Sequence, residues 1–585
     1  MPLASFSLRC SYLTFSILAF IATLSMEPNT KFKYLGPFSS FKPINMASQG
    51  DYEDIVARLE STNSVIEELR RIGGNAGISL GVLHHGSVIY RANFGYRDME
   101  AKIAPDSDTA FYIASMGKAM AANALTSLVK DGKVSFDTKL ADLVPEYRDA
   151  SDILKCKELA TEATLLDLMA HRLGITAGNN FWSQKSSKIL VDKSETAKIV
   201  GFLQPVAPFR SSFVYSNWGY GLLGEIMESV SGEDLESLYQ RTLFKPLGLE
   251  RSSLETIAGE WENVTKCYQA LSDATPYEIP PTPYRAGSAR AAAGAVKSTV
   301  NELLHLYGAW MAAAKDQAYT GQNQTPGSPF THVSAQWTPH NKITEESDYG
   351  LGWVLTNLPA KASITSLNPF EGPDVPVLAK GTTPRRLVYH HGSVIGGLSS
   401  VYLLPDTETA IVVLGNTFDL FDTPDFISQI LLEALLDVPE PNDYVELGRR
   451  IAASTLSQLP VTAAKLAAEQ VQGTSASLPL EAYAGKYYNL AGNFSLDISV
   501  LPGGDGLKMV PMSVEESAYD LRHYHYDVFF WPGADRDLQL MEALFPQPLP
   551  GFHKVEFRVD DQGNVVSANW QIDRAIPDGE TFYKK

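Results

Sequence analysis

A serine and a lysine three residues apart stand at the start of an apolar, alanine-rich stretch, and this pair constrains the chain more than any other feature. The stretch runs from Phe111 to Leu125 and predicts a loop that enters a helix, with Ser115 at its start and Lys118 one turn later. Residues three apart lie on one face of a helix, so the lysine amine can reach the serine hydroxyl. Because a free serine hydroxyl needs a neighbouring base to become a nucleophile, the pair predicts nucleophilic catalysis. The unpaired N–H groups at a helix start also favour an oxyanion there.

Other serine motifs compete with this one. The same spacing recurs at Ser39–Lys42, in a Pro-flanked irregular stretch, and at Ser127–Lys130, late in the same predicted helix and away from its free end. The segment Gly77–Gly81, with Ser79 at its centre, matches the nucleophile elbow of α/β-hydrolases, which requires a strand before the serine and a helix after it. Here a predicted helix precedes and a predicted strand follows. We therefore expect Ser79 to be an ordinary strand residue.

A Tyr-x-Asn triplet, Tyr215 to Asn217, precedes a glycine-punctuated apolar helix. A phenol beside Lys118 could relay a proton as a general acid or base does. The Asn217 amide both donates and accepts hydrogen bonds, so it could hold a substrate carbonyl. The alternative is a buried tyrosine followed by a helix N-cap, and a second triplet at Tyr487–Asn489 shows that the pattern is not specific.

A strand that ends in a glycine-rich turn carries two adjacent histidines, His390 and His391. Side chains alternate across a strand, so only one of them can line a site, and we expect it to be His390. Gly392 permits close approach of the backbone, and the Ser393 N–H could be an oxyanion donor opposite the Ser115 N–H. His391 would point into the packing behind the sheet, unless a bulge inverts the register.

The hexapeptide His-His-Gly-Ser-Val-Ile occurs there and also at His84–Ile89. The earlier copy joins two apolar runs, which predicts a hairpin with Gly86 and Ser87 at the turn. We interpret this copy as structural.

Taken in order and at these separations, the motifs resemble those of the class C β-lactamase-like serine hydrolases of the penicillin-binding-protein superfamily, which include esterases, D-amino-acid peptidases and fungal acyltransferases. The resemblance covers about residues 51 to 437. Its key positions are Ser115-x-x-Lys118, Tyr215-x-Asn217 and His390-x-Gly392, and further matches lie at Leu165–Gly174, Lys245–Leu249, Ala292–Thr299 and Tyr349–Trp353.

The resemblance implies an acyl-enzyme on Ser115, with Lys118, Tyr215 and His390 as the other catalytic residues. It implies substrate contacts from Asn217, Gly392 and Ser393, and neither a cofactor nor a metal. The β-lactamases have a lysine where this chain has His390. Histidine is mostly neutral at pH 7, with an unperturbed pKa of ~6.5. We therefore expect a neutral ester or thioester rather than an anionic, penicillin-like substrate.

The resemblance also implies an α+β fold, in which an antiparallel sheet is flanked by helices and accompanied by an all-helical region, with a small β-barrel-like domain at the C-terminus. The expected segments are a candidate signal peptide at 1–25, an irregular tail at 26–50, a β-lactamase-like domain at 51–440, a bridging helix at 441–476 and a lipocalin-like β domain at 477–585. The pattern further predicts a loop at 312–341 and a helix at 425–436 with Thr423 as its N-cap. A start at Met46 would remove the candidate signal and favour a cytoplasmic protein over a secreted one.

Composition limits the possible partners. With 585 residues and a formal net charge of −19, the chain is a poor match for nucleic acid or an anionic membrane surface. Its three cysteines are widely spaced and predict neither a disulfide framework nor a metal site. The alternating run His523–Tyr526 favours a strand over a metal site, because no third ligand is adjacent.

The sequence therefore predicts a serine hydrolase that acts on a small-molecule ester, thioester or amide, and the expected setting is secondary metabolism. An acyltransferase that uses the same acyl-enzyme is the first alternative, and a non-catalytic binding protein of the same fold is the second. The oligomeric state is left open.

Overall fold

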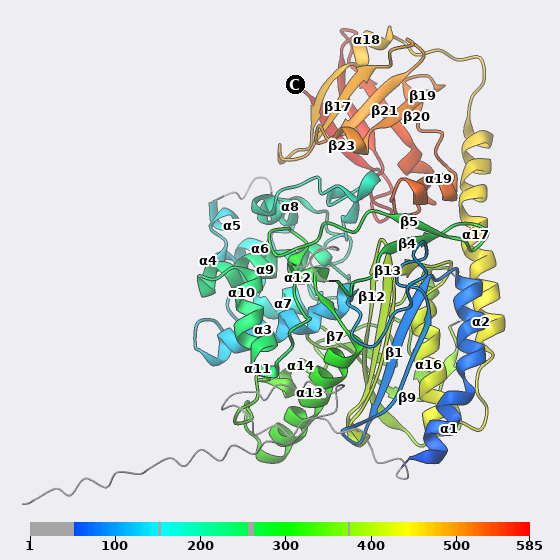
Figure 1. Ribbon diagram of the computed structural model, residues 1–585. Helices are drawn as coiled ribbons and strands as arrows, with labels where there is room; N and C mark the ends of the chain where they lie inside the picture. Colours follow the sequence, from blue (N-terminus) through cyan, green and yellow to red (C-terminus); the bar gives the residue numbers. More distant parts are fainter. Residues whose placement is uncertain (1–51, 150–153, 256–261, 372–374) are drawn as a thin grey trace, which may run out of the picture. The chain divides into compact units, whose positions relative to one another are not determined.

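An eight-stranded antiparallel sheet forms the centre of the fold (Figure 1). The computed structural model describes residues 52–149, 154–255, 262–371 and 375–585, so the candidate signal peptide and the tail lie outside the described residues. The strand order is β2-β1-β14-β13-β12-β9-β8-β7. The strands are β1 (Gly77–His84), β2 (Ser87–Gly95), β7 (Asn341–Lys342), β8 (Ser347–Tyr349), β9 (Val354–Leu358), β12 (Arg385–Val394), β13 (Gly397–Leu404) and β14 (Thr409–Gly415).

The early hairpin pairs with the late strands, as predicted, because β1 lies beside β14 with Gly81 opposite Val412. Within the hairpin, His84 pairs with Ser87, so the turn residues are His85 and Gly86. The turn therefore lies one residue earlier than predicted. Both turn residues have positive φ, 47° and 72°, as a two-residue hairpin loop that follows the twist of its strands requires.

Alternating side chains of the sheet build two separate cores. Val412 and Leu414 belong to a core with α13 (Val300–Thr320), whereas Ile411 and Val413 belong to a core with α16 (Thr423–Leu436). Figure 1 shows these two helices on opposite sides of the sheet. The nucleophile motif lies on the α13 side.

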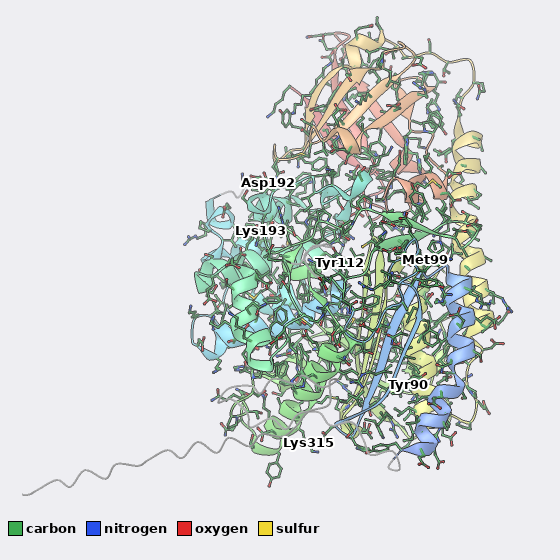
Figure 2. The ribbon with its side chains drawn as sticks, viewed as in Figure 1. Tyr90, Met99, Tyr112, Asp192, Lys193 and Lys315 are labelled. Carbon is green, nitrogen blue, oxygen red and sulfur yellow. The ribbon has the colours of Figure 1, made fainter. Side chains whose placement is uncertain are left out.

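Two N-terminal helices cover the α16 side of the sheet. These are α1 (Glu53–Ser61) and α2 (Asn63–Gly73), and the long helix α17 (Tyr444–Glu469) packs along α2. The Tyr90 hydroxyl of β2 donates to Asn63 at the start of α2, which ties the edge of the sheet to this layer (Figure 2).

The all-helical region lies on the α13 side and is mostly made of short helices. Besides α13 it contains α3 (Gly117–Lys130), α4 (Leu140–Leu143), α5 (Pro145–Asp149), α6 (Glu158–Thr161), α7 (Leu165–Met169), α8 (Thr196–Phe202), α9 (Asn217–Ser231), α10 (Leu235–Tyr239), α11 (Lys245–Leu247), α12 (Ala291–Gly294) and α14 (Val333–Gln336). Minor elements are β3 (Phe111–Tyr112), β4 (Cys267–Ala270), β5 (Pro276–Ile279), β6 (Lys297–Ser298), β10 (Ala360–Lys361), α15 (Asn368–Glu371), β11 (Val377–Leu378) and β15 (Thr417–Phe418).

Two predicted boundaries are wrong. The predicted loop from residue 312 is still helical, because α13 continues to Thr320 and ends at Gly321 with a φ of 68°. The N-cap of α16 is Asp422 rather than Thr423, since the Asp422 carboxylate accepts the Asp425 N–H. Thr423 is instead the first helical residue.

The C-terminal β domain is a closed eight-stranded barrel, which confirms the predicted barrel-like domain. Its elements are α18 (Leu480–Tyr483), β16 (Gly485–Tyr488), β17 (Ser495–Val500), β18 (Leu507–Pro511), β19 (Tyr519–His525), β20 (Val528–Phe530), α19 (Arg536–Met541), β21 (Lys554–Val559), β22 (Val565–Trp570) and β23 (Glu580–Lys584). His523 and His525 lie on β19, and no group of three or more potential metal ligands is found among the described residues. In the same residues, no helix combines the length and apolarity that a membrane span needs.

Candidate active site

The predicted nucleophile, Ser115, lies in a tight turn between β3 and α3. The turn is a single 3₁₀ turn, Ala114–Met116, so the α-helix begins at Gly117 rather than at the serine. Between Thr109 and Thr126 every residue is buried except Ser115, which is partly exposed. Ala114 has a φ of 47°, a conformation that costs a residue with a Cβ atom free energy and that recurs at functional sites. The turn thus presents one serine from an otherwise buried segment.

The amine of Lys118 is buried and has three neighbours. Its Nζ lies 3.0 Å from Ser115 Oγ, 2.7 Å from Asn217 Oδ1 and 2.7 Å from the carbonyl oxygen of Ala293. Two of these atoms are carbonyl oxygens that can only accept, so a neutral amine donates its two N–H groups to them and directs its lone pair at the serine hydroxyl. Burial, together with the charge of Arg290, lowers the pKa of Lys118 well below its usual range. The geometry is that of a base for Ser115.

Tyr215 reaches the same serine from the segment before α9. Lys118 Nζ lies 4.9 Å from the centre of its ring. Burial raises the pKa of Tyr215 above its ordinary value, although Ser115 and the charge of Arg290 oppose this. At neutral pH the phenol therefore keeps its proton and is suited to donate it to a leaving group.

His171, from the predicted match Leu165–Gly174, supports Tyr215. Its ring centre lies 4.3 Å from that of Tyr215, and its Nδ1 accepts the N–H of Ser216 at 3.0 Å. Because Nδ1 accepts, the neutral ring carries its proton on Nε2. The sequence motif showed that this histidine belongs to the pattern but not that it lies against the tyrosine.

Asn217 is the first residue of α9, and its side-chain amide is hydrogen-bonded mostly to other groups of the protein. Its Oδ1 accepts from Lys118, and its Nδ2 donates to Asn179 Oδ1 at 3.2 Å. One amide N–H remains for a substrate, so the predicted substrate contact stays a prediction. Two neighbouring groups were not predicted from the sequence. Asn179 begins a short 3₁₀ helix, Asn179–Phe181, that carries no motif, and the carbonyl group of Ala293 has a role that leaves no trace in residue type.

Strand β12 passes directly beside the nucleophile turn, and Gly392 allows this approach. A Cβ atom at Gly392 would lie 2.2 Å from the Ile113 carbonyl oxygen and 2.3 Å from Ser399 Oγ, far inside van der Waals contact. Ser393 follows and is partly exposed, and its Oγ has no partner among the described residues. The close approach is what an oxyanion hole built from the Ser115 and Ser393 N–H groups requires.

His390 faces the site and His391 faces the opposite side of the sheet, as the alternation along the strand predicts. His390 is fully buried, with Nδ1 2.6 Å from the His391 carbonyl oxygen and Nε2 3.0 Å from the Tyr349 hydroxyl. The carbonyl can only accept, so Nδ1 carries the proton and Nε2 accepts from Tyr349. Burial and the nearby charge of Lys118 lower the pKa of His390 to about 3. His390 is thus neutral with both nitrogens occupied, and its predicted catalytic role remains a prediction.

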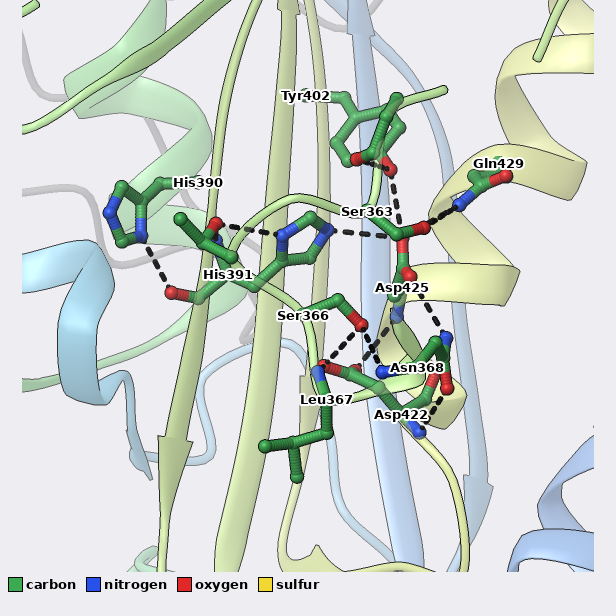
Figure 3. Close-up of polar contacts among 12 residues, drawn as sticks. Ser363, Ser366, Leu367, Asn368, His390, His391, Tyr402, Asp422, Asp425 and Gln429 are labelled. Carbon is green, nitrogen blue, oxygen red and sulfur yellow. Dashed lines mark hydrogen bonds and ion pairs between the residues drawn. The ribbon is translucent and has the colours of Figure 1, made fainter. Parts of the chain in front are cut away.

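Behind the sheet, His391 joins a buried network centred on Asp425 of α16 (Figure 3). His391 Nε2 lies 3.0 Å from Asp425 Oδ1. The same carboxylate accepts hydrogen bonds from Tyr402, Gln429 and Asn368. Burial raises the pKa of Asp425, but the interaction with His391 and the hydrogen bonds outweigh this and hold the pKa at about 2. This network fastens β12 to α16 directly behind the site.

We expect Asp425→Asn to destabilise the protein by about 3–5 kcal/mol at pH 7, because it removes one partner of a buried, hydrogen-bonded pair. Urea unfolding of wild type and variant measures the difference. Asp437→Asn is the matched control, since Asp437 is the C-cap of the same helix and its side chain is 78% exposed. A loss no larger than that of the control would contradict a structural role for the network.

The pH dependence of this difference has a definite sign. The folded-state pKa of Asp425, about 2, lies below the unfolded value of ~3.9. Its contribution to the free energy of unfolding is therefore complete above about pH 4 and is lost as the pH falls towards 2. We expect the difference in unfolding free energy between wild type and Asp425→Asn to narrow over that range.

The geometry agrees with what comparison with known proteins finds. The Beta-lactamase family model matches residues 62–434, and the model of a domain of unknown function, DUF3471, matches residues 469–584. The chain is 23% identical over 450 residues to unguisins hydrolase from Aspergillus violaceofuscus, and the match covers 74% of each protein.

Two solved structures share the fold. A penicillin-binding protein homologue from Pyrococcus abyssi has 20% identity and a TM-score of 0.50, with 90% of this chain and 100% of that chain covered. A class C β-lactamase from Rhodobacter sphaeroides has 21% identity and a TM-score of 0.50, with 66% of this chain and 99% of that chain covered.

Proposed function

The chain belongs to the β-lactamase family, whose members are serine hydrolases, and we propose that it cleaves a small-molecule ester, thioester or amide through an acyl-enzyme on Ser115. The arrangement of Lys118 is the observation that carries the proposal. Two obligate acceptors take N–H groups of its amine, so in the neutral amine the lone pair faces the Ser115 hydroxyl. A serine with a buried, deprotonated amine at hydrogen-bonding distance is an activated nucleophile.

The reaction uses groups already in place. Ser115 Oγ attacks the acyl carbon while its proton passes to Lys118, and the Ser115 and Ser393 N–H groups stabilise the oxyanion. The Tyr215 phenol protonates the leaving group as the bond to the acyl carbon breaks. Water then attacks the acyl-enzyme, gives up a proton to the same pair of residues and restores Ser115.

Transfer of the acyl group to an alcohol would use the same intermediate and the same groups. The likeness to a fungal hydrolase of unguisins supports hydrolysis, in small-molecule metabolism, as the first choice. Ser115 lies within hydrogen-bonding distance of Lys118, and the Lys118 amine lies 4.9 Å from the centre of the Tyr215 ring, which speaks against a non-catalytic binding protein.

The proposal is tested by intact-mass analysis after mixing the protein with a panel of activated acyl esters, with and without added alcohols. We expect a transient mass increase equal to the acyl group, located on Ser115 by peptide mapping and lost in Ser115→Ala. Release of the free acid indicates hydrolysis, and a new ester in the presence of alcohol indicates transfer. If no ester acylates Ser115 and a fluorophosphonate also fails to label it, the proposed function is wrong.

A further inference from the structure

The loop that carries Asn179 is held from two sides, and one of those sides is the C-terminal barrel. The Gly178 N–H donates to Asp573 Oδ2 at 2.8 Å, and the Gly178 carbonyl oxygen accepts the indole N–H of Trp218 at 2.9 Å. Asp573 lies in the connection between β22 and β23 of the barrel, whereas Trp218 lies in the first turn of α9. Gly178 thus joins the barrel to the helix that begins with Asn217.

The Asp573 carboxylate is itself fixed in this contact. Its Oδ2 also accepts the hydroxyl of the buried Thr176 at 2.7 Å, and its Oδ1 accepts the Ala575 N–H at 2.9 Å within the same connection. Hydrogen bonds to an ionised acceptor are stronger than those between neutral groups. Three donors therefore hold the carboxylate, and through it the barrel holds the backbone from Thr176 to Gly178.

The barrel contacts the same loop again on the other side of Asn179. Asn180 Nδ2 donates to the carbonyl oxygen of Ile572 at 2.7 Å, and the Tyr519 hydroxyl of β19 donates to Gln184 Oε1 at 2.7 Å. The exposed side chain of Asn179 lies between these anchors. Its position therefore depends on contacts that the barrel supplies.

From Asn179, two hydrogen bonds lead to the base. Asn179 Oδ1 accepts Asn217 Nδ2 at 3.2 Å, and Asn217 Oδ1 accepts Lys118 Nζ at 2.7 Å. An amide has a donor end and an acceptor end, so the acceptor on Asn179 determines that the oxygen of Asn217 faces the lysine. If that amide turned over, its N–H groups would face Lys118 and would compete with Ser115 for the lone pair.

We propose that Asp573 is a positioning residue of the active site. Through Gly178 it holds Asn179 in place. Asn179 in turn orients the Asn217 amide, on which the direction of the Lys118 lone pair depends. The inference rests on the proposed function and adds to it a role for the C-terminal domain.

The alternative is that Asp573 only fastens the barrel to the β-lactamase-like domain. The loss of a fastener would lower activity whichever side chain stands at position 179. A positioning residue that acts through Asn179 has no effect once that side chain is removed. A double-mutant cycle with Asn179→Ala separates the two roles, because residues that act through one another show non-additive losses.

The cycle is measured on the full chain as kcat/KM for 4-nitrophenyl butyrate, or for another 4-nitrophenyl ester if this one reacts too slowly. Nitrophenolate leaves without a proton, so the rate reports how well Lys118 activates Ser115. We expect Asp573→Ala to lower kcat/KM by about tenfold, within the ~10²-fold that a displacement of about 1 Å can cost. In the Asn179→Ala background the same substitution should cost less than about twofold.

The conservative variant Asp573→Asn keeps the shape of the side chain and an oxygen that can accept from both donors. A neutral acceptor is weaker than a carboxylate, so we expect a loss of only about threefold, which should also disappear in the Asn179→Ala background. This variant keeps the cycle measurable if Asp573→Ala does not fold.

Asp537→Ala is the matched control. Asp537 Oδ1 accepts both the N–H and the hydroxyl of Ser272 at 2.7 Å, so it makes the same kind of contact between the two domains at another place. This substitution should leave kcat/KM unchanged. Melting temperatures show whether each variant is folded.

The inference is wrong if a folded Asp573→Ala variant keeps the kcat/KM of wild type. A loss that persists undiminished in the Asn179→Ala background, or one that Asp537→Ala matches, would identify a fastener. If no ester acylates Ser115 in wild type, the proposed function fails and this inference with it. Acylation that is insensitive to Asp573 overturns only the positioning role.

Discussion

Replacing Ser115 by alanine should lower kcat by ~10⁴-fold or more, the scale seen when the nucleophile of a serine hydrolase is removed. In the proposed mechanism Ser115 Oγ forms the covalent bond, and no other serine hydroxyl lies at hydrogen-bonding distance from Lys118 among the described residues. The stability of the fold should change little. The serine is partly exposed, and Lys118 keeps its two carbonyl acceptors when the hydroxyl is lost.

Labelling with a fluorophosphonate, followed by peptide mass mapping, checks this prediction directly. Ser79→Ala is the matched control, because Ser79 is the rival serine of the sequence. The structure places it on β1, fully buried, with its Oγ donating to Asn93 Oδ1 at 2.7 Å. We expect that control to cost about 1 kcal/mol of stability and to label normally. An adduct on Ser79, or labelling that survives in Ser115→Ala, would remove Ser115 from the mechanism.

The local part of the site was predictable because it depends on short-range geometry. Ser115 and Lys118 are three residues apart, and their 3.0 Å contact follows from helical spacing. The opposite directions of His390 and His391 follow from alternation along a strand, which here stays regular through Gly392. In contrast, the contact between Lys118 and Asn217 spans 99 residues. It could be expected only from the resemblance to a family.

Other parts of the site leave no trace in residue type. The Ala293 acceptor is a backbone carbonyl, so its selection depends on where α12 lies and not on the alanine side chain. The Asn179 side chain likewise belongs to no motif, and its contact with Asn217 depends on the fold.

The error in α13 has a simple cause. The composition of residues 312–341 as a whole, rich in Gln, Thr, Gly and Pro, favours a loop. Its first part, up to Thr320, is dominated by alanine, lysine and glutamine, which are good helix formers. Gly321, with its positive φ, is the stop signal that separates the two parts. Averaging over the whole segment hid this boundary.

Lys118 and Tyr215 should behave as one proton-transfer unit. Lys118 Nζ lies 3.0 Å from Ser115 Oγ and 4.9 Å from the centre of the Tyr215 ring. Groups that act together show strongly non-additive losses, so Lys118→Ala, Tyr215→Phe and the double variant should all lose roughly 10³-fold or more in kcat, and by similar factors. Lys130→Ala, at the exposed end of the same helix, is the control and should leave kcat unchanged.

The pH profile separates the roles within the unit. Burial and the Arg290 charge lower the pKa of Lys118, so kcat/KM should rise with pH as the amine loses its proton, at a pH well below the ordinary lysine value of ~10.4. This rise of kcat/KM with pH should vanish in Lys118→Ala and persist in Tyr215→Phe. Burial raises the pKa of Tyr215. Ionisation of the phenol should therefore not lower activity until the pH exceeds ~10, the ordinary pKa of tyrosine. If the fold-losses in kcat of the two single variants multiply in the double variant, the two residues act independently. If the rise of kcat/KM with pH persists in Lys118→Ala, the base is another group.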